Sequence, residues 1–363
     1  MRYPPQKTST DAGFVTLTFT RMKKANSIFD TFNRPLKDLR ISVIDRCNFR
    51  CTYCMPDKED TRHHSFLRPQ EWLTFEEIIR LTKFFVDAGV TKVRLTGGEP
   101  LLRPNLVELI GRLRTISGIK DLALTTNGSL LSQYAHDLKK AGLDRITVSL
   151  DTLDAGLFHQ MSGNKGGPGK VLDGITVCED LGFASIKINV VLQKGVNDRD
   201  VLGLVEYFKG RKPVLRFIEY MDVGNCNHWD LRYVVPTREI VDLINTRFLL
   251  RPLAAKEFGE VAARYEFADG SGEIGFISSV TQPFCATCTR GRISAQGKMY
   301  TCLFSGEGVD LRVPLRRGAG DEELLALIQD VWQKRTDRYS ELRTKIRSSP
   351  EQPHKVEMFQ IGG

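Results

Sequence analysis

The sequence has no long hydrophobic run: no apolar stretch approaches the ~18 residues that a membrane span needs, so no membrane partner is expected. The N-terminus also lacks the apolar core of a signal peptide. Residues 1–30 are basic and poor in acidic side chains. We therefore predict that residues 1–31 are a disordered leader or follow an upstream start codon, with a transit peptide as the alternative.

Cysteines are not spread along the chain as in the disulfide framework of a secreted protein. Two of the eight stand alone and six form two triplets: Cys178 and Cys226 alone, then Cys47, Cys51 and Cys54, and Cys285, Cys288 and Cys302. Such tight triplets favour metal ligation in a reducing compartment, so a cytoplasmic protein is expected. We interpret the extra thiol Cys226 as structural or incidental.

The chain carries a formal net charge of +8. A charge of this sign fits either simple solubility or an anionic partner such as nucleic acid or a phosphorylated small molecule. However, the chain shows no platform of basic and aromatic residues on which bases could stack. A nucleic-acid partner is therefore not expected.

From residue 38 to about residue 248, strand-like and helix-like segments alternate. The strand candidates are residues 39–44, 92–96, 122–126, 146–150, 187–192 and 214–219. Six β–α units predict an α/β fold with a parallel sheet, and both an open doubly wound sheet and an incomplete barrel fit the pattern. A capping box at Thr74 and Glu77 predicts the start of the first helix, and Pro104 the start of the second.

The pattern changes after residue 250. Strands are predicted around the turn at residues 269–272, a hairpin is predicted from strands 290–294 and 298–302, and one more helix carries Leu324, Leu327, Ile328 and Val331. We therefore divide the chain into the leader, a main domain at 32–249 and a C-terminal α+β region at 250–363.

The first cysteine triplet directly follows the first predicted strand, where parallel α/β folds place their active-site loops. Three thiolates could bind zinc with a fourth ligand from elsewhere, or three irons of a [4Fe–4S] cluster whose fourth iron stays open. A second motif, Thr-Gly-Gly-Glu-Pro at residues 96–100, ends the second strand. Its two glycines would let the backbone approach a ligand closely.

Several predicted strands carry cations on one face. Lys92 and Arg94 are two residues apart and therefore point the same way. Charges on a strand covered by helices need a partner, so they indicate a lumen that could bind a polyphosphate. The same feature recurs at Arg40, Lys187 and Arg216.

The second triplet has no histidine nearby. A zinc ribbon that lacks one ligand is the alternative to a second iron–sulfur cluster with an open iron. Arg290 and Arg292 share one face of the following strand and could flank a ligand there. We expect both arginines to act on the substrate and not on the cluster.

Together these motifs resemble the MoaA family, the radical S-adenosylmethionine (SAM) GTP 3′,8-cyclases of molybdenum cofactor biosynthesis. The resemblance covers roughly residues 32–363 and rests on both triplets, the motif at 96–100, Thr-Thr-Asn-Gly at 125–128, Ser-Leu-Asp at 149–151, residues 216–224 and the terminal double glycine. It implies an incomplete (βα)6 TIM-like barrel whose C-terminal α+β region carries a second iron–sulfur cluster.

The resemblance also implies the site residues. Two [4Fe–4S] clusters would be bound by Cys47, Cys51 and Cys54 and by Cys285, Cys288 and Cys302. SAM would contact Tyr53, Gly98, Ser149 and Met221. The substrate GTP would contact Arg40, Arg94, Thr125, Lys187, Arg290, Gly291 and Arg292, and also Lys92 and Arg216. The tail residues Gly362 and Gly363 would enter the active site and steer the reaction.

In this family a radical formed from SAM abstracts hydrogen from C3′ of GTP, and the C3′ radical attacks guanine C8 to give 3′,8-cyclo-7,8-dihydro-GTP. An electron donor, transfer of the product to MoaC and a homodimer are expected in addition. The loop at 161–169 is richer in glycine than the family suggests. Two rival interpretations are another radical SAM enzyme with an auxiliary cluster, and a zinc-dependent RNA-binding module.

Overall fold

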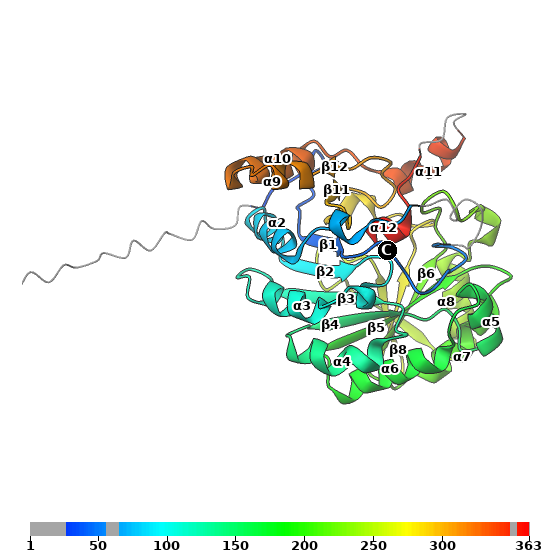
Figure 1. Ribbon diagram of the computed structural model, residues 1–363. Helices are drawn as coiled ribbons and strands as arrows, with labels where there is room; N and C mark the ends of the chain where they lie inside the picture. The colour runs from blue at the N-terminus through cyan, green and yellow to red at the C-terminus, as the bar shows by residue number, and fades with distance from the viewer. Residues whose placement is uncertain (1–26, 56–64, 349–353, 363) are drawn as a thin grey trace, which may run out of the picture.

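The computed structural model describes residues 27–55, 65–348 and 354–362. Its centre is a run of six parallel strands that are neighbours in chain order (Figure 1). These strands are β1 (Asp38–Ser42), β2 (Lys92–Thr96), β3 (Asp121–Thr126), β4 (Arg145–Ser149), β5 (Ser185–Leu192) and β6 (Val214–Glu219). A doubly wound sheet would reverse its strand order at a switch point, and this run does not, so the incomplete barrel is confirmed.

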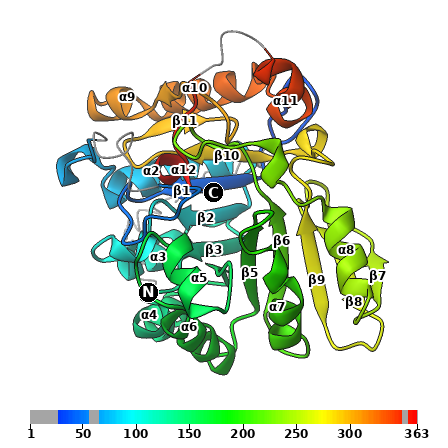
Figure 2. The same cartoon turned by 90° about the vertical axis from the view of Figure 1, so that its right-hand side faces the viewer.

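Helices cover the outer face of the parallel strands (Figure 2). They are α2 (Phe75–Asp87), α3 (Leu106–Arg114), α4 (Leu131–Lys140), α5 (Ala155–Met161), α6 (Pro168–Asp180), α7 (Val201–Phe208) and α8 (Thr237–Asn245). The predicted capping box is present, because Thr74 Oγ1 accepts from Glu77 N and the Glu77 carboxylate accepts from Thr74 N. Helix α3 starts two residues after the predicted Pro104, because Asn105 takes a left-handed conformation (φ 60°) that cannot continue a helix.

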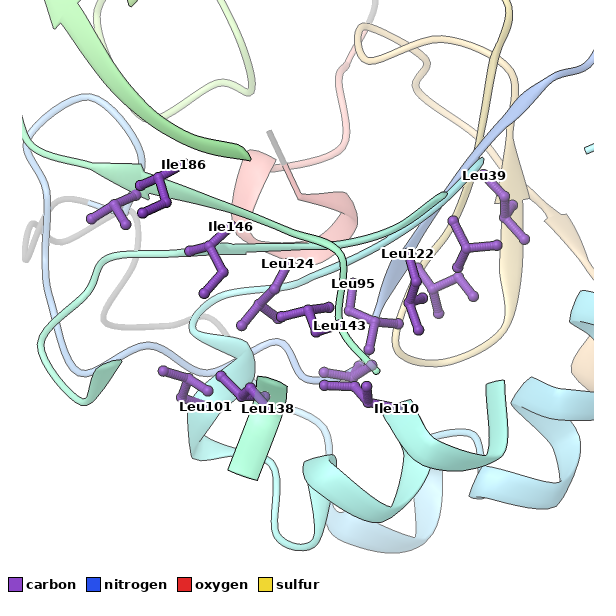
Figure 3. Close-up of a cluster of buried hydrophobic side chains, with 14 of the residues drawn as sticks. Leu39, Leu95, Leu101, Ile110, Leu122, Leu124, Leu138, Leu143, Ile146 and Ile186 are labelled. Atoms are coloured by element: carbon purple, nitrogen blue, oxygen red, sulfur yellow. The ribbon is translucent and has the colours of Figure 1, made fainter. Parts of the chain in front are cut away.

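The core lies between the strands and this layer of helices. Leu39, Leu95, Leu122 and Ile146 are all fully buried, and Figure 3 shows Leu95 and Leu122 between the strands and Ile110 of α3. Each such side chain contributes roughly 1.5–3 kcal/mol to stability. Outward positions on these strands are therefore apolar, which leaves the inward positions free to carry charge.

The C-terminal region extends both edges of the six-stranded run. At one edge β9 (Glu273–Ile277) pairs in parallel with β6 and continues into β8 (Ala263–Phe267) and β7 (Leu250–Leu253). At the other edge β10 (Arg290–Ile293) pairs in parallel with β1 and forms the predicted hairpin with β11 (Lys298–Tyr300), followed by β12 (Val309–Asp310). The second triplet therefore lies next to the first barrel strand.

The remaining helices lie mostly above the β1 edge (Figures 1 and 2). They are α9 (Arg312–Arg316), α10 (Asp321–Gln333), α11 (Tyr339–Arg347) and the short α12 (Met358–Ile361), with 3-10 turns at η1 (Pro69–Glu71), η2 (Pro100–Leu102), η3 (Asp198–Asp200), η4 (Leu231–Tyr233) and η5 (Cys285–Thr287). Both views place α12 against β1 and β2, on the lumen side of the strands.

The last residues of the predicted leader at 1–31 pack against the rest of the chain. Ile28 and Asp30 are both buried, and Ile28 N donates to Ala88 O at 3.1 Å. Residues 1–26 lie outside the described residues. Among the helices that the structure describes, none has the length and apolar character to cross a membrane.

Candidate active site

The first cysteine loop and the Gly-Gly-Glu-Pro motif are joined through their backbones. Gly98 N donates to Ile44 O at 2.9 Å and Glu99 N donates to Arg46 O at 2.8 Å. A Cβ atom at Gly97 would lie 2.3 Å from Ile44 O, and one at Gly98 would lie 2.2 Å from Arg46 O. The two glycines therefore let the backbone of their motif approach the backbone of the cysteine loop, and this contact holds the two motifs together.

Polar groups surround the first thiol of that loop. Phe49 N and Asn127 Nδ2 donate to Cys47 Sγ at 3.4 and 3.7 Å. Burial, followed by the nearby Glu99 carboxylate, raises the pKa of Cys47 to about 11. A positive centre such as iron would overcome this cost, because it stabilises the thiolate.

Two carboxylates, the fully buried Glu99 and the half-buried Asp151, accompany the first triplet, and sequence reasoning gave neither of them a role. Glu99 accepts from Thr126 Oγ1 and Asn127 N, both at 2.7 Å, and burial raises its pKa to about 7. Asp151 accepts from Tyr53 Oη at 2.7 Å, and burial raises its pKa to about 6. Both carboxylates belonged to recognised motifs, and a buried acid within a motif is the signal that could have found them.

The glycine-rich loop at 161–169 also serves the first triplet. Arg50 N donates to Ser162 O at 2.9 Å, and Thr52 N donates to Met161 O at 3.1 Å. Gly163 has φ 71°, and a Cβ atom there would lie 2.3 Å from Arg50 O. This loop therefore packs against the backbone of the first cysteine loop.

A cavity of about 450 Å³ occupies the barrel lumen. Its size is typical of a site for a small molecule. Cations from the inward strand positions line it, as the alternation of side chains predicted: Arg40, Lys92, Arg94, Arg145, Lys187, Arg216, Arg290 and Arg292. Arg145 is the member of this set that the sequence analysis missed, because the predicted strand began at residue 146 whereas β4 begins at Arg145. Its guanidinium forms an ion pair with Asp121 at the start of β3.

Hydrogen bonds orient several of these cations. Arg94 Nη1 donates to Thr125 Oγ1 and Thr147 Oγ1, both at 2.9 Å. Arg216 Nη2 donates to Asn189 Oδ1 at 2.6 Å, while its buried Nε has no partner among the described residues. The cavity therefore holds donors that a ligand could satisfy.

The cations repel one another strongly. Burial, followed by Arg216, Arg145 and Arg94, lowers the pKa of Lys187 to about 7. Burial and neighbouring arginines also lower the pKa of Arg216 and of Arg292 to about 9 each. An anion in the lumen would relieve this repulsion.

A loop at residues 254–262 crosses the end of the lumen that lies at the start of the strands. Glu257 forms an ion pair with Lys92. A Cβ atom at Gly259 would lie 2.9 Å from Thr289 Cγ2, next to β10. The loop therefore runs from the β7–β8 edge toward the opposite edge of the sheet and helps to enclose the cavity.

The second triplet borders the same cavity, since Cys285, Cys288 and Cys302 all line it. Arg290 Nη2 donates to Cys288 Sγ at 3.4 Å. Burial opposes ionisation of Cys288, but Arg290 and then Arg335 outweigh it and lower its pKa to about 6. The contact differs from the expectation that Arg290 acts on the substrate alone, because the guanidinium lies beside the sulfur.

The tail meets the lumen through Arg292, whose Nη1 donates to Gly362 O and, at 3.4 Å, to Ile361 O. Gly362 has φ 67°, and a Cβ atom there would lie 2.1 Å from Thr96 Cγ2. Only glycine fits this position without displacement. Gly363 lies outside the described residues.

Three other predicted contacts lie in different surroundings. Met221 borders the cavity, and Ser149 is half-buried at the end of β4. Gly291 faces away from the lumen, because a Cβ atom there would lie 3.1 Å from Leu36 Cδ1. Strand alternation explains this, since Gly291 stands between two inward arginines.

The residues present fit iron–sulfur clusters. All eight cysteines lie in the described residues and none forms a disulfide. Within the described residues, no three His, Cys, Asp or Glu side chains converge closely enough to hold a single metal ion. Donors to Cys47 and Cys288 sulfur would stabilise the thiolates that a cluster requires.

Known families match both halves of the chain. The family model of the radical SAM superfamily matches residues 41–208, and that of Molybdenum Cofactor Synthesis C matches residues 214–341. A protein of Xanthomonas axonopodis pv. citri named GTP 3′,8-cyclase is 51% identical over 334 residues, which cover 92% of this chain and 98% of that protein. The chain belongs to the GTP 3′,8-cyclase family.

Other GTP 3′,8-cyclases agree: the protein of Staphylococcus epidermidis is 44% identical over 337 residues, covering 93% of this chain and 99% of the relative. A solved structure of Streptococcus suis SuiB bound to S-adenosylmethionine matches with a TM-score of 0.53 at 18% identity, covering 75% of this chain and 61% of SuiB. SuiB bound to its precursor peptide SuiA matches with a TM-score of 0.58 at 17% identity, covering 88% and 68%. At these identities the likeness to SuiB concerns the fold alone.

Proposed function

We propose that this protein is a radical SAM enzyme that converts GTP to 3′,8-cyclo-7,8-dihydro-GTP, the first step of molybdenum cofactor biosynthesis. One observation carries the proposal. Cations from the barrel strands and the second cysteine triplet border one cavity, and Arg292 links that cavity to the glycine tail. A triphosphate and a base could thus be held at two ends of one lumen.

Two [4Fe–4S] clusters and SAM are the cofactors in this proposal. The first cluster would be held by Cys47, Cys51 and Cys54, and the second by Cys285, Cys288 and Cys302. SAM would lie against Tyr53, Gly98, Ser149 and Met221. When bound, the first cluster and SAM supply the radical that begins the reaction.

The lumen cations would hold the triphosphate of GTP. Burial, followed by the charges of Arg216, Arg145 and Arg94, lowers the pKa of Lys187 to about 7, so a polyanion would be drawn to the site and would restore the charge of the lysine. These contacts bind substrate and transition state alike, so their loss should raise KM more than it lowers kcat. The other proposed GTP contacts are Arg40, Arg94, Thr125, Arg216, Lys92, Arg290 and Arg292, and Gly291, which faces away from the lumen, would contribute only its backbone.

Enclosure would confine the reacting nucleotide. The loop at 254–262 closes one end of the lumen, and Gly362 fills the space beside Thr96 at the other. A nucleotide held in this way has few alternative hydrogens within reach, which favours attack at one position.

Further partners follow from the family resemblance. We propose that an external donor supplies the electron, that the product passes to MoaC, and that the enzyme acts in the cytoplasm, with a homodimer as the expected assembly. We further propose that the chain divides into a leader at 1–31, a barrel at 32–249 and a C-terminal region at 250–363. The burial of Ile28 and Asp30 supports a first boundary closer to the N-terminus.

An anaerobic reaction with reconstituted protein, SAM, a reductant and GTP tests the proposal. 5′-Deoxyadenosine and a cyclised nucleotide should both appear, and UTP at the same concentration should give no cyclised product. Reductive SAM cleavage without any GTP-dependent product, with both clusters filled, would favour the rival radical SAM enzyme. A colourless protein with stoichiometric zinc would favour the RNA-binding module.

A further inference from the structure

The chain segment before the first strand forms a compact turn around one carboxylate. Asp30 Oδ1 accepts from Phe32 N at 3.0 Å and from Arg34 N at 2.9 Å, and Asp30 N donates to Arg34 O at 3.2 Å. Asn33 makes the bend with φ 59°. The turn therefore fixes the carboxylate at a buried position outside the barrel.

Two buried arginines bind the other oxygen of this carboxylate. Arg34 Nε donates to Asp30 Oδ2 at 2.6 Å, and Arg335 Nη1 reaches the same atom at 3.4 Å. The side chains are 1% exposed for each arginine and 0% for the aspartate. Arg335 follows α10, so the network joins segments about 300 residues apart in the sequence, from position 30 to position 335.

Each arginine also reaches the turn that carries the second triplet. Arg34 Nη1 donates to Cys285 O at 2.7 Å, and Arg335 Nη1 donates to Cys288 O at 2.8 Å. Asp337 completes the network through its carbonyl, at 2.9 Å from Arg34 Nη1, and its carboxylate, at 3.2 Å from Arg335 Nε. Two cysteines of the triplet are thus held by the same pair of guanidinium groups.

Stability alone does not require this arrangement. A buried ion network can often be replaced by apolar side chains without loss of stability, since desolvation offsets the attraction of the charges. The Nη2 atom of Arg34 is buried without a hydrogen-bond partner among the described residues, which adds to the cost. Arg34 and Arg335 nevertheless border the cavity beside the three cysteines.

We propose that Arg34 and Arg335, held on Asp30, are positioning residues for the second cluster: they fix the backbone of its cysteine turn and raise its reduction potential through their charge. A cation beside a cluster stabilises the reduced form, which carries one more negative charge. This inference rests on the proposed function, because it requires that Cys285, Cys288 and Cys302 hold an iron–sulfur cluster.

Opposite substitutions in one network test the inference. Asp30→Asn removes a negative charge, while the side-chain oxygen can still accept from the turn. Arg335→Met removes a positive charge. In redox titrations of the intact protein followed by electron paramagnetic resonance, Asp30→Asn should raise the potential of the second cluster and Arg335→Met should lower it. The first cluster, titrated in the same samples, should not move.

Two further variants separate charge from structure. Arg335→Lys keeps the charge and should leave the potential closer to wild type than Arg335→Met. Arg103→Met is the matched control, because Arg103 donates to the Val43 and Leu73 carbonyls at 3.2 and 2.9 Å, away from the second triplet. It should lower the melting temperature without moving the potential of the second cluster.

Shifts of Asp30→Asn and Arg335→Met in the same direction, or no shift in either with the iron content intact, would overturn the inference. If Arg335→Met does not retain the second cluster, Asp30→Asn decides the question. A raised potential of the second cluster in Asp30→Asn supports the inference, and an unchanged potential rejects it. A wild-type protein without a second cluster would instead refute the proposed function, so the two failures are distinguishable.

Discussion

The two cysteine triplets lie in opposite electrostatic surroundings. Glu99 is near the first triplet, and together with burial it raises the pKa of Cys47 to about 11. Arg290 and Arg335 are near the second triplet, and they lower the pKa of Cys288 to about 6 despite its burial. Cys47 therefore lies where negative charge is opposed and Cys288 where it is favoured, although burial and then Asp337 raise the pKa of Cys302 in the second triplet to about 12.

This difference fits two divergent roles. A cluster in acidic, apolar surroundings is hard to reduce and gives its electron up readily, which suits the cleavage of SAM. A cluster beside arginines binds its thiolates more easily and lies where a polyanionic substrate is attracted. The difference comes from the strands: the carboxylates follow β2 and β4, whereas the arginines belong to β10 and the segment after α10.

Replacement of each triplet in turn is expected to have the largest effect, because the two replacements should abolish different steps of the reaction. Alanine at Cys47, Cys51 and Cys54 should abolish 5′-deoxyadenosine formation and leave about half of the iron. Alanine at Cys285, Cys288 and Cys302 should also halve the iron, but it should keep reductive SAM cleavage and lose GTP conversion. Iron analysis and product chromatography measure both effects. Loss of SAM cleavage in both sets would mean that the triplets do not act separately.

The glycine tail lies between the two cysteine triplets' strands, since Gly362 contacts both Thr96 at the end of β2 and Arg292 of β10. Gly362→Ala would place a methyl group 2.1 Å from Thr96 Cγ2, at a φ of 67° that alanine rarely adopts. Displacement of the tail by about 1 Å should lower cyclised product roughly 100-fold, as misplacement in active sites does. Deletion of Gly362 and Gly363 should have the same effect.

Both tail variants should keep the two clusters and 5′-deoxyadenosine formation. The tail is anchored separately, because Lys355 Nζ donates to Asp222 Oδ2 at 2.9 Å and Phe359 is buried. Measurement of 5′-deoxyadenosine and cyclised nucleotide in one reaction gives their ratio directly. Wild-type amounts of cyclised product from the truncated enzyme would show that the tail has no role in the active site.

The sequence predicted these two triplets and most of the lumen for identifiable reasons. Strand alternation placed Lys92 and Arg94 on one face, and the cavity confirms it. It could not predict that Arg34 and Asp30 lie beside the second triplet, because their contacts cross about 250 to 300 residues of sequence and leave no local pattern. For the same reason the sequence did not predict the burial of Ile28 and Asp30.

Contacts between neighbouring loops were equally hidden. The glycines of the second motif suggested a close approach to a ligand, but the partner of Gly98 in the structure is the Arg46 carbonyl. Spacing shows that a glycine is needed and not what approaches it. Likewise, Arg290 and Arg292 were predicted to have equal roles, whereas in the structure Arg290 donates to the Cys288 sulfur and Arg292 to the Gly362 carbonyl.

Among the arginines near the second triplet, Arg292 is expected to have a moderate effect on GTP binding when it is replaced by alanine. The loss of one charged hydrogen bond to substrate should cost about 1.5–3 kcal/mol, or roughly 10- to 150-fold in GTP affinity. Equilibrium binding of GTP to the anaerobic protein measures this, with iron content as the control for folding. Because Arg292 also binds the tail, the tail deletion serves as the matched control, and it should weaken GTP binding less. Unchanged affinity in Arg292→Ala would exclude it from the substrate site.

The smallest expected effect is a pH dependence of GTP binding through Lys187. Burial and three neighbouring arginines lower its pKa from 10.5 to about 7, and a bound triphosphate should raise it again. Below pH 7 the lysine is already charged, so binding takes up no proton there. Above pH 7 binding must take up a proton, so affinity should fall by at most about tenfold between pH 7 and pH 8.

The same shift affects folding in the opposite sense to a salt-bridged lysine. Between pH 7 and 10.5 the folded protein holds fewer protons than the unfolded chain at this site, so its stability should rise with pH over that window.

Titration of GTP affinity from pH 7 to 9 tests the pH dependence of GTP binding, and calorimetry in two buffers of different ionisation enthalpy counts the protons taken up on binding. Lys187→Arg should keep the affinity and flatten its pH profile, since arginine stays charged throughout. An equally steep profile in that variant would assign the proton uptake to another group.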